Sequence, residues 1–250
     1  LAERILNSRF GDKIINHYTY VFASDGCLME GLSHEACSFA GHLNLSKLIV
    51  FFDDNSISID GSTDLSVSDN HLKRFKSYGW ATIKINGHNH SEISNAIKEA
   101  KKNKQPTLIA CKTIIGFGSP NKKSTAASHG SPLGEEEIAL TRKKLKWHHA
   151  PFEIPDNLIK QWRNFSSKNF KSKNIWIRNF KKIKNSKKFK MYFNNKLPSE
   201  LTKKINAFKS LNFIEKTRCA TRKSSEMSLE LLTPYLQNLI GGSADLTGSN

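Results

Sequence analysis

Cysteine is scarce in this sequence, with four residues among 250. The four lie far apart and form no C-x-x-C pair, so we expect free thiols in a reducing cytoplasm rather than a disulfide framework. Long apolar runs are missing as well. Because no stretch of about 18 apolar residues occurs, the sequence predicts no membrane-spanning helix and no membrane partner.

Acidic residues are outnumbered, since 22 Asp and Glu stand against 39 Lys and Arg, for a formal net charge of +17. The excess is local: fifteen basic residues and one acid, Glu200, lie between Lys160 and Lys204. Clustered cations release counterions from phosphate backbones, so this segment favours a nucleic-acid-binding protein. It lacks ordered metal-ligand spacing and any RNA-binding signature, and we therefore do not expect a nucleic-acid partner.

An initiator methionine and a signal peptide are also absent, because the chain starts at Leu1 with Ala2 and Glu3 following. The other end, residues 241–250, is a turn-rich stretch with no closing element after it. Both ends predict a piece of a longer protein.

Apolar periodicity predicts an α/β architecture. Short β-branched and aromatic runs predict buried strands at residues 18–24, 48–52, 80–85 and 107–112. Apolar residues at helical spacing predict helices at 29–43, 91–102, 135–145 and 221–238, and one capped by Asp69 that runs to residue 78. Strands that alternate with helices predict a parallel sheet that is flanked by helices and buried on both faces.

Two further segments complete this architecture. The stretch 115–134 is rich in glycine, proline and hydroxyl residues, and it predicts a long functional loop. The stretch from Lys160 to the 190s combines lysine with aromatic residues and predicts a Lys-rich helical connector. Residues 197–200 lead from it into a new helix that Ser199 is expected to cap.

Polar residues follow two of the predicted strands. Ser24-Asp25-Gly26 ends the first, and Asp53-Asp54-Asn55 ends the second. Neighbouring parallel strands bring their carboxyl ends to one edge of the sheet, where α/β proteins bind ligands. A carboxylate, an amide oxygen and a backbone carbonyl there suit Mg²⁺, which prefers oxygen ligands and shares them with phosphate. The alternative is that Asp-Gly is an ordinary cap and turn.

The same residues resemble the Gly-Asp-Gly…Asn-Asn signature of thiamine diphosphate enzymes. More specifically, the sequence resembles the transketolase family in five stretches: Cys27-Leu-Met-Glu-Gly-Leu-Ser-His-Glu35, Asp53-Asp-Asn-Ser-Ile-Ser-Ile-Asp-Gly61, Cys111-Lys-Thr-Ile-Ile-Gly-Phe-Gly-Ser-Pro-Asn-Lys122, Ser128-His-Gly-Ser-Pro-Leu-Gly134 and Gly241-Gly-Ser-Ala-Asp-Leu246. The resemblance is close over 18–155, returns at residues 221–224, and is weak over 160–213. One residue departs from the signature: its first glycine is Ser24, whose added bulk puts tight cofactor binding in doubt.

The resemblance implies roles for individual residues. It implies a divalent ion, Mg²⁺ or Ca²⁺, held by Asp25, Asn55 and the backbone oxygen of Ile57. It implies thiamine diphosphate contacts from Asp25 and Asn55 and from four more residues: Gly26, Ile59, His129 and Asp245. Substrate phosphate and hydroxyl contacts are implied for His129, Arg222 and Ser249, with His129 also the acid/base group. Dimer contacts are implied for Glu30 and Glu35.

Each of these residues has an ordinary alternative role when it is considered alone. His129 in a Gly/Ser loop is typical of a surface histidine, and Arg222 among Lys and Glu is typical of a solvated side chain. Ile57 and Ile59 alternate with Ser, which is typical of a half-buried strand, and Glu30 and Glu35 can stabilise the start of a helix. Several long motifs in the right order favour the functional roles.

The implied function is transfer of a two-carbon ketol unit from a ketose phosphate to an aldose phosphate, in the pentose phosphate pathway, by a cytoplasmic homodimer with its active site between subunits. The implied domains are the C-terminal part of the diphosphate-binding domain at 1–190, a linker at 191–212, and the start of the pyrimidine-binding domain at 213–250. Because upstream histidines, a glycine loop and a downstream glutamate of the family are missing, we expect little turnover from this chain alone. The alternatives are a dihydroxyacetone synthase-like enzyme, an inactive homologue, and a nucleic-acid-binding protein acting through 160–204.

Overall fold

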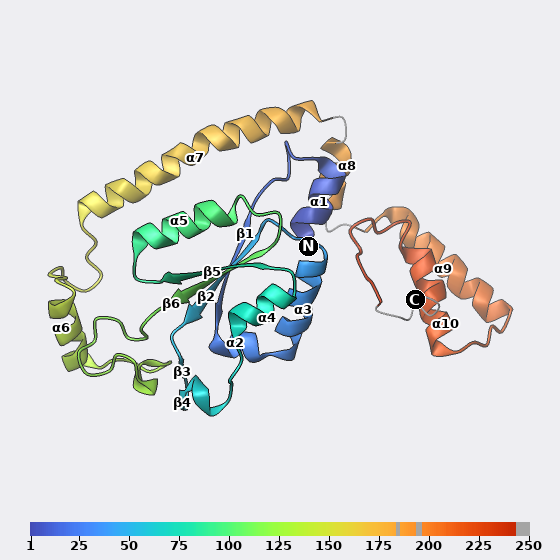
Figure 1. Cartoon of the computed structure of the whole chain (residues 1–250). Helices are drawn as coiled ribbons and strands as arrows, with labels where there is room; N and C mark the ends of the chain where they lie inside the picture. Colours follow the sequence, from blue (N-terminus) through green and yellow to red (C-terminus); the bar gives the residue numbers. More distant parts are fainter. Residues whose placement is uncertain (184–185, 194–196, 244–250) are drawn as a thin grey trace. The chain divides into compact units, whose positions relative to one another are not determined.

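The computed structural model describes residues 1–183, 186–193 and 197–243, and the chain divides into two compact units, Leu1–Trp176 and Ile177–Asn250. The first unit is built on a four-stranded sheet in the order β1-β2-β6-β5, from Thr19–Ser24, Leu48–Asp54, Thr107–Lys112 and Ala81–Asn86. All three strand pairs are parallel. The predicted α/β class with a parallel sheet flanked by helices is thereby confirmed (Figure 1).

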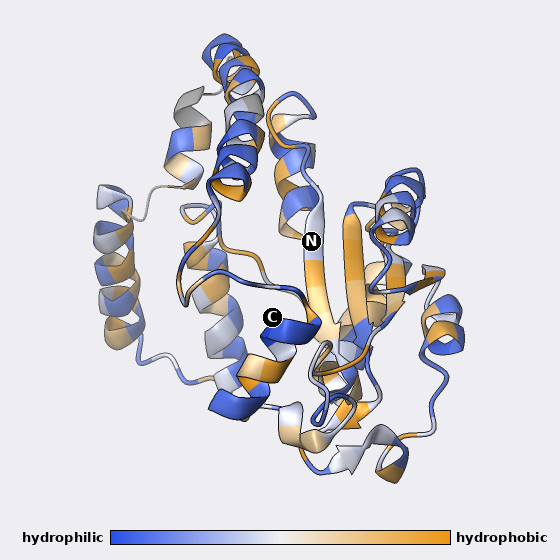
Figure 2. Cartoon of the chain, turned by 90° about the vertical axis from the view of Figure 1, so that its left-hand side faces the viewer, coloured by the Kyte–Doolittle hydropathy of each residue, from blue (hydrophilic) through white to orange (hydrophobic). Residues whose placement is uncertain are grey.

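Helices pack on both faces of this sheet. On one face lie α2 (Asp25–Met29), α3 (Gly31–His42) and α4 (His71–Ser77), which enclose an apolar cluster around Phe52, Phe75 and Trp80. On the other face α5 (His90–Ala100) covers Ile49, Ile85 and Ile109. The strands are accordingly the most hydrophobic segments of the unit (Figure 2). Burial of these faces, rather than helix propensity, holds the short helices in place.

The strand predicted at 18–24 is present as β1, but the prediction that it is buried is wrong. Of β1, Ala23 alone is buried, and Phe22 is 81% exposed. The reason is that α5 packs on side chains of β2, β5 and β6 on this face of the sheet and leaves Phe22 uncovered. Tyr20 and Phe22 stack on Phe51 at centroid distances of 6.3 and 5.2 Å, and line an open apolar hollow of about 830 Å³.

Several helix boundaries differ from expectation. The helix predicted at 29–43 is α3, which begins two residues later, at Gly31. A separate short helix, α2, precedes it, and Glu30 has extended backbone angles between the two. Asp69 is not the cap of α4; Asn70 takes that place, and its side chain accepts from the Lys73 N–H at 2.9 Å. Asp69 instead pairs with Arg74 at 2.8 Å. Ser199 is not a cap either, since it is the first residue of α9 and Pro198 precedes it.

A small hairpin and a long loop follow the strands on the carboxyl side of the sheet. The hairpin consists of β3 (Ile57–Ser58) and β4 (Gly61–Ser62), and a 3-10 turn η1 (Thr63–Leu65) leads on to α4. The loop runs from β6 to α6 (Glu135–Lys144) and contains the 3-10 turn η2 (Ala126–Ser128). Helix α1 (Ala2–Phe10) precedes β1.

The described part of the basic segment is mostly helical, as predicted. Helix α7 (Asp156–Lys182) continues from the first unit into the second, and Trp176 donates from its indole N–H to the Ile14 carbonyl at 2.9 Å. The second unit adds α8 (Ser186–Tyr192), α9 (Ser199–Ile214) and α10 (Thr221–Leu232), of which the last two are in contact. Among the described helices, none combines the length and apolar character needed to span a bilayer.

Gly41 marks the closest packing between α3 and the turn after α4. A Cβ built at this position would lie 1.8 Å from the Tyr78 carbonyl oxygen, whereas one at Gly31 would meet nothing within 4 Å. We expect Gly41→Ala to lower the free energy of unfolding by roughly 1–3 kcal/mol, because backbone has to move. Gly31→Ala, the matched control on the same helix, is expected to be neutral or slightly stabilising. Urea unfolding measures both; equal effects would contradict the packing described.

Candidate functional site

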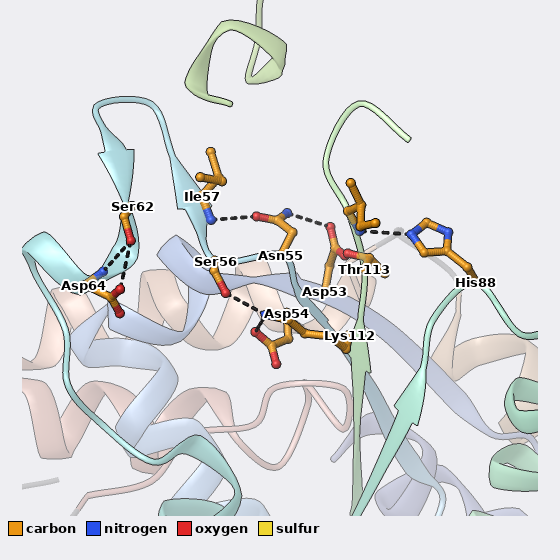
Figure 3. A network of polar contacts seen from close by, with 11 residues as sticks. Asp53, Asp54, Asn55, Ser56, Ile57, Ser62, Asp64, His88, Lys112 and Thr113 are labelled. Atoms are coloured by element: carbon orange, nitrogen blue, oxygen red, sulfur yellow. Dashed lines mark hydrogen bonds and ion pairs between the residues drawn. The ribbon is translucent and has the colours of Figure 1, made fainter. Parts of the chain in front are cut away.

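The candidate site lies at the carboxyl edge of the sheet, as predicted for parallel strands. The register of β1 and β2 pairs Ser24 with Asp53, so Asp25 and Asp54 leave their strands side by side. The register of β2 and β6 pairs Asp54 with Lys112 in the same way. The chain therefore gathers its strand-end polar residues at one edge before any ligand is considered (Figure 3).

Asp25 is the buried acid of this edge. It begins α2, is 5% exposed, and its Oδ2 atom has no hydrogen-bond partner. Burial, and next the negative charge of Asp54, raise the pKa of Asp25 above its ordinary value of 3.8. A buried carboxylate oxygen without a partner costs free energy, and a hard cation is the ligand that would relieve this cost.

Asn55 is held in place by its neighbours. Its Oδ1 accepts from the Ile57 N–H at 2.9 Å, and its Nδ2 donates to Asp53 at 3.1 Å (Figure 3). Ser56, which lies between Asn55 and Ile57, has a φ of 64°, an unusual conformation for a residue with a side chain. These bonds orient the amide, and the Asn55 oxygen has to share or exchange its Ile57 contact to ligate a metal.

Lys112 supplies the cation of the edge, and the sequence did not single it out. Its Nζ lies 3.2 Å from Asp54 Oδ1 and donates to Ser56 Oγ at 2.7 Å. The next residue, Thr113, donates from its hydroxyl to Asp53. Lys112 ends β6 and Thr113 follows it, so strand order could have revealed them, but no motif in the sequence marks which strand follows β2 in the sheet.

The hairpin β3-β4 carries the two isoleucines of the predicted site. Ile57 starts β3, and Ile59 lies at the turn with 70% of its surface exposed. An exposed apolar side chain beside a charged edge is available to pack against a ring, as the resemblance implies for Ile59. A cavity of about 280 Å³ lies between η1, the start of α4 and the sheet, and is lined by Asp25, Asp54, Asp64, His71 and Lys84 among others.

Ser24 and Gly26 flank Asp25. A Cβ at Gly26 would meet nothing within 4 Å, so the space beside this backbone is open to a ligand. The Ser24 hydroxyl lies 3.3 Å from the Cys27 sulfur. This contact, first among several causes, lowers the pKa of the Cys27 thiol below its ordinary value of 9.0. The Ser24 hydroxyl therefore contacts its own helix, α2.

His129 follows η2 in the long loop and is half-buried. Its backbone N–H donates to Ala126 at 2.8 Å, while its ring Nδ1 is buried and has no partner. The acid/base role expected for His129 stays a prediction.

Glu137 anchors this loop, and the sequence did not single out this residue either. The residue is buried, and its carboxylate accepts from the Ser119 hydroxyl and from Asn121. The Ser119 bond, followed by those of Asn121, lowers the pKa of Glu137 to about 2. In sequence it is one of three acids at the start of a helix, and only the fold shows that it faces inward.

The remaining predicted residues lie elsewhere. Glu30 and Glu35 are exposed, at the start and in the middle of α3. Arg222 is exposed on α10 in the second unit. Asp245 and Ser249 fall outside the described residues. All of these roles stay predictions.

The residues of the edge fit a metal-bound diphosphate. The unpartnered Asp25 oxygen calls for a cation, and the open backbone at Gly26 leaves room beside it. Within 1–183, 186–193 and 197–243, no group of three or more His, Cys, Asp or Glu could hold a metal. A site here therefore uses one acid with amide and backbone oxygens and completes its shell from water and phosphate.

A parallel sheet with acids, an amide and a lysine at one carboxyl edge defines an α/β protein that binds a charged ligand there. The comparisons with known proteins identify the ligand and the family. Residues 1–201 match the family model described as "Transketolase, thiamine diphosphate binding domain". The chain belongs to the transketolase family.

Individual relatives agree with this assignment. A transketolase of Buchnera aphidicola subsp. Acyrthosiphon pisum is 49% identical over 262 residues, covering 100% of this chain and 39% of the relative. The transketolase structure from Campylobacter jejuni matches 99% of this chain and 38% of its own, with 30% identity and a TM-score of 0.86. A Pichia stipitis transketolase complex with sedoheptulose 7-phosphate matches 97% of this chain and 36% of its own chain, with 36% sequence identity and a TM-score of 0.82. The chain thus spans about two-fifths of the length of such relatives.

The buried Asp25 is expected to cost stability when no ligand is bound. Folding raises the pKa of Asp25 above the value of 3.8 that applies to the unfolded chain. The protonated acid therefore contributes to the free energy of unfolding below pH 3.8, and this contribution is lost as pH rises through the higher pKa of the folded state. We expect Asp25→Asn to match the parent near pH 3.5 and to be more stable by about 1 kcal/mol at pH 7.

Urea unfolding across this pH range measures the difference, with the exposed Asp60→Asn as a control for removing one acid near the site. A parent that is more stable than Asp25→Asn at pH 7 without ligand would contradict the unpartnered carboxylate.

Proposed function

We propose that the chain is the cofactor-binding part of a transketolase that moves a two-carbon ketol unit between sugar phosphates in the pentose phosphate pathway. The observation that carries the proposal is the buried Asp25 with a partnerless oxygen at the edge it shares with Asn55, inside a thiamine diphosphate binding domain. The relative solved with sedoheptulose 7-phosphate supports sugar phosphates as the substrate class.

In this proposal Asp25, Asn55 and the Ile57 carbonyl hold Mg²⁺ or Ca²⁺, and the backbone at Gly26 lies along the diphosphate. Thiamine diphosphate itself supplies the carbanion and electron-sink chemistry when bound. Ile59 packs on the ring. His129 holds or accepts a proton near the reacting substrate, with its free Nδ1 or its other ring nitrogen.

The second unit contributes substrate contacts in this proposal. Arg222 on α10 is exposed, and its planar guanidinium suits a sugar phosphate. Asp245 and Ser249 complete the set that the family resemblance implies. Since the chain spans about two-fifths of its relatives, we propose that alone it transfers ketol units slowly or not at all.

Cofactor binding tests the proposal directly. Calorimetric titration of the chain with thiamine diphosphate and Mg²⁺ is expected to show binding that chelation of the metal abolishes. Asp25→Asn is expected to weaken it by roughly a hundredfold, the cost of losing a charged metal ligand, and Asn55→Ala by roughly tenfold. The exposed Asp60→Asn serves as the matched control and is expected to bind as the parent does. Thiamine diphosphate binding that is unchanged by removal of the metal and by Asp25→Asn would refute the site.

We also propose that the chain self-associates through α3. Leu32 and Phe39 are 76% and 53% exposed, and they share one helix face with Glu35, since the three are spaced by three and four residues. An apolar pair around an acid, on a helix that begins at Gly31 directly after Glu30, is a surface that a second subunit could cover.

A charged residue in this surface is expected to block association. Leu32→Asp and Phe39→Asp should each raise the dissociation constant of the dimer at least tenfold, because each leaves a charge in an apolar contact. Sedimentation measures this change as a shift toward the monomer. Ser94→Asp on the exposed side of α5 is the control. If the parent is monomeric at every concentration tested, the dimer proposal fails.

The nucleic-acid alternative has less support. The family model extends to residue 201 and therefore includes most of the basic segment that begins at Lys160. Those lysines lie within a recognised domain rather than on an added arm. The dihydroxyacetone synthase-like alternative is of the same class, and profiling of donors and acceptors with a longer form would separate the two.

A further inference from the structure

Glu137 is a buried acid that the cofactor edge does not use. It lies in the first turn of α6, is 7% exposed, and three donors converge on its carboxylate. The Ser119 hydroxyl and the Asn121 N–H (2.9 Å) donate to Oε1, and the Asn121 side chain donates to Oε2 at 2.9 Å. Charge-assisted bonds of this kind are stronger than neutral ones.

A chain of hydrogen bonds continues from this turn to the residue before His129. Ser119 also accepts from the Lys122 N–H at 3.0 Å, so Glu137 holds the whole turn 119–122. The Lys122 carbonyl then accepts from the hydroxyl of Ser128. Packing enforces the arrangement, because a Cβ at Gly116 would lie 2.5 Å from Ser128 Oγ.

We propose that Glu137 is a positioning residue for His129: its carboxylate fixes the turn 119–122, and the turn fixes Ser128 and so the direction of the histidine that follows. The inference rests on the proposed function, because His129 has chemistry to perform only there. Glu137 itself touches no reacting group in this proposal.

The contact requires an acceptor at both oxygens. A carboxylate accepts at every lone pair, whereas a glutamine in its place presents an NH₂ donor to the Asn121 side chain, which is also a donor in this bond. Asn121→Asp would restore an acceptor there. The pair Glu137→Gln with Asn121→Asp therefore rebuilds the donor and acceptor pattern with the roles exchanged.

A second explanation is that Glu137 acts only as a negative charge at a helix N-terminus. Glu135 and Glu136 share that first turn and are exposed. Glu136→Gln removes the same charge from the same turn without touching the loop, and is the matched control.

The experiment measures the reactivity of His129 in the whole chain without ligand. Diethyl pyrocarbonate modifies imidazoles, and tryptic residues 124–142 contain His129 as their single histidine. Glu137→Gln is expected to speed modification of His129 roughly tenfold, the effect of losing a charge-assisted anchor on local opening. Glu136→Gln is expected to match the parent, and Asn121→Asp/Glu137→Gln to return to it. Half-buried His34 on α3 reports global unfolding and should keep its rate.

Three results would overturn the proposal: an unchanged His129 rate in Glu137→Gln, an equal rise in Glu136→Gln, or a rise at His34 as large as at His129. Failure of the double variant to restore the rate, with circular dichroism unchanged, counts against it as well. Protection of His129 in the parent by thiamine diphosphate with Mg²⁺ tests the proposed function separately, because the variant comparison needs no cofactor.

Discussion

The site depends on the parallel register of β1 with β2 and of β2 with β6. This pairing places Ser24 opposite Asp53, and Asp54 opposite Lys112, so that three chain segments end together. The apolar residues within the strands supply the free energy that holds the register, because a shift by one residue would turn each buried side chain to the opposite face. The polar edge is therefore maintained by a core that takes no part in its chemistry.

Charge at this edge is arranged for a ligand rather than for stability. Asp25 is buried beside Asp54 and Asp53, and the one nearby cation, among those that influence its pKa, is Lys112. The partnerless oxygen of Asp25 is a local cost that the surrounding sheet sustains. Glu137 shows the opposite case, since three donors satisfy its carboxylate and it stabilises the loop that carries His129. Asp25 thus has an oxygen without a hydrogen-bond partner, whereas both oxygens of Glu137 accept hydrogen bonds.

Local sequence signals predicted the strands and helices well where burial and propensity agree. The run 107–112 coincides with β6, and Glu135 begins α6 as expected. The signals failed where neighbours decide. Residues 18–24 have the composition of a buried strand, yet most of β1 is exposed, because α5 packs on the other three strands on this face of the sheet. Asp69 and Asn70 are equally good caps in sequence, and the ion pair of Asp69 with Arg74 accompanies the choice of Asn70.

The sequence by itself determined the family, the parallel α/β class and the strand-end positions of Asp25 and Asn55, because these follow from motif order and from patterns that repeat over a few residues. Only the tertiary structure decided that Lys112 joins Asp54 and that Glu137 rather than Glu136 faces the loop. These contacts link residues 58 and 16 positions apart, and no local pattern encodes which strands become neighbours or which side of a helix turns inward.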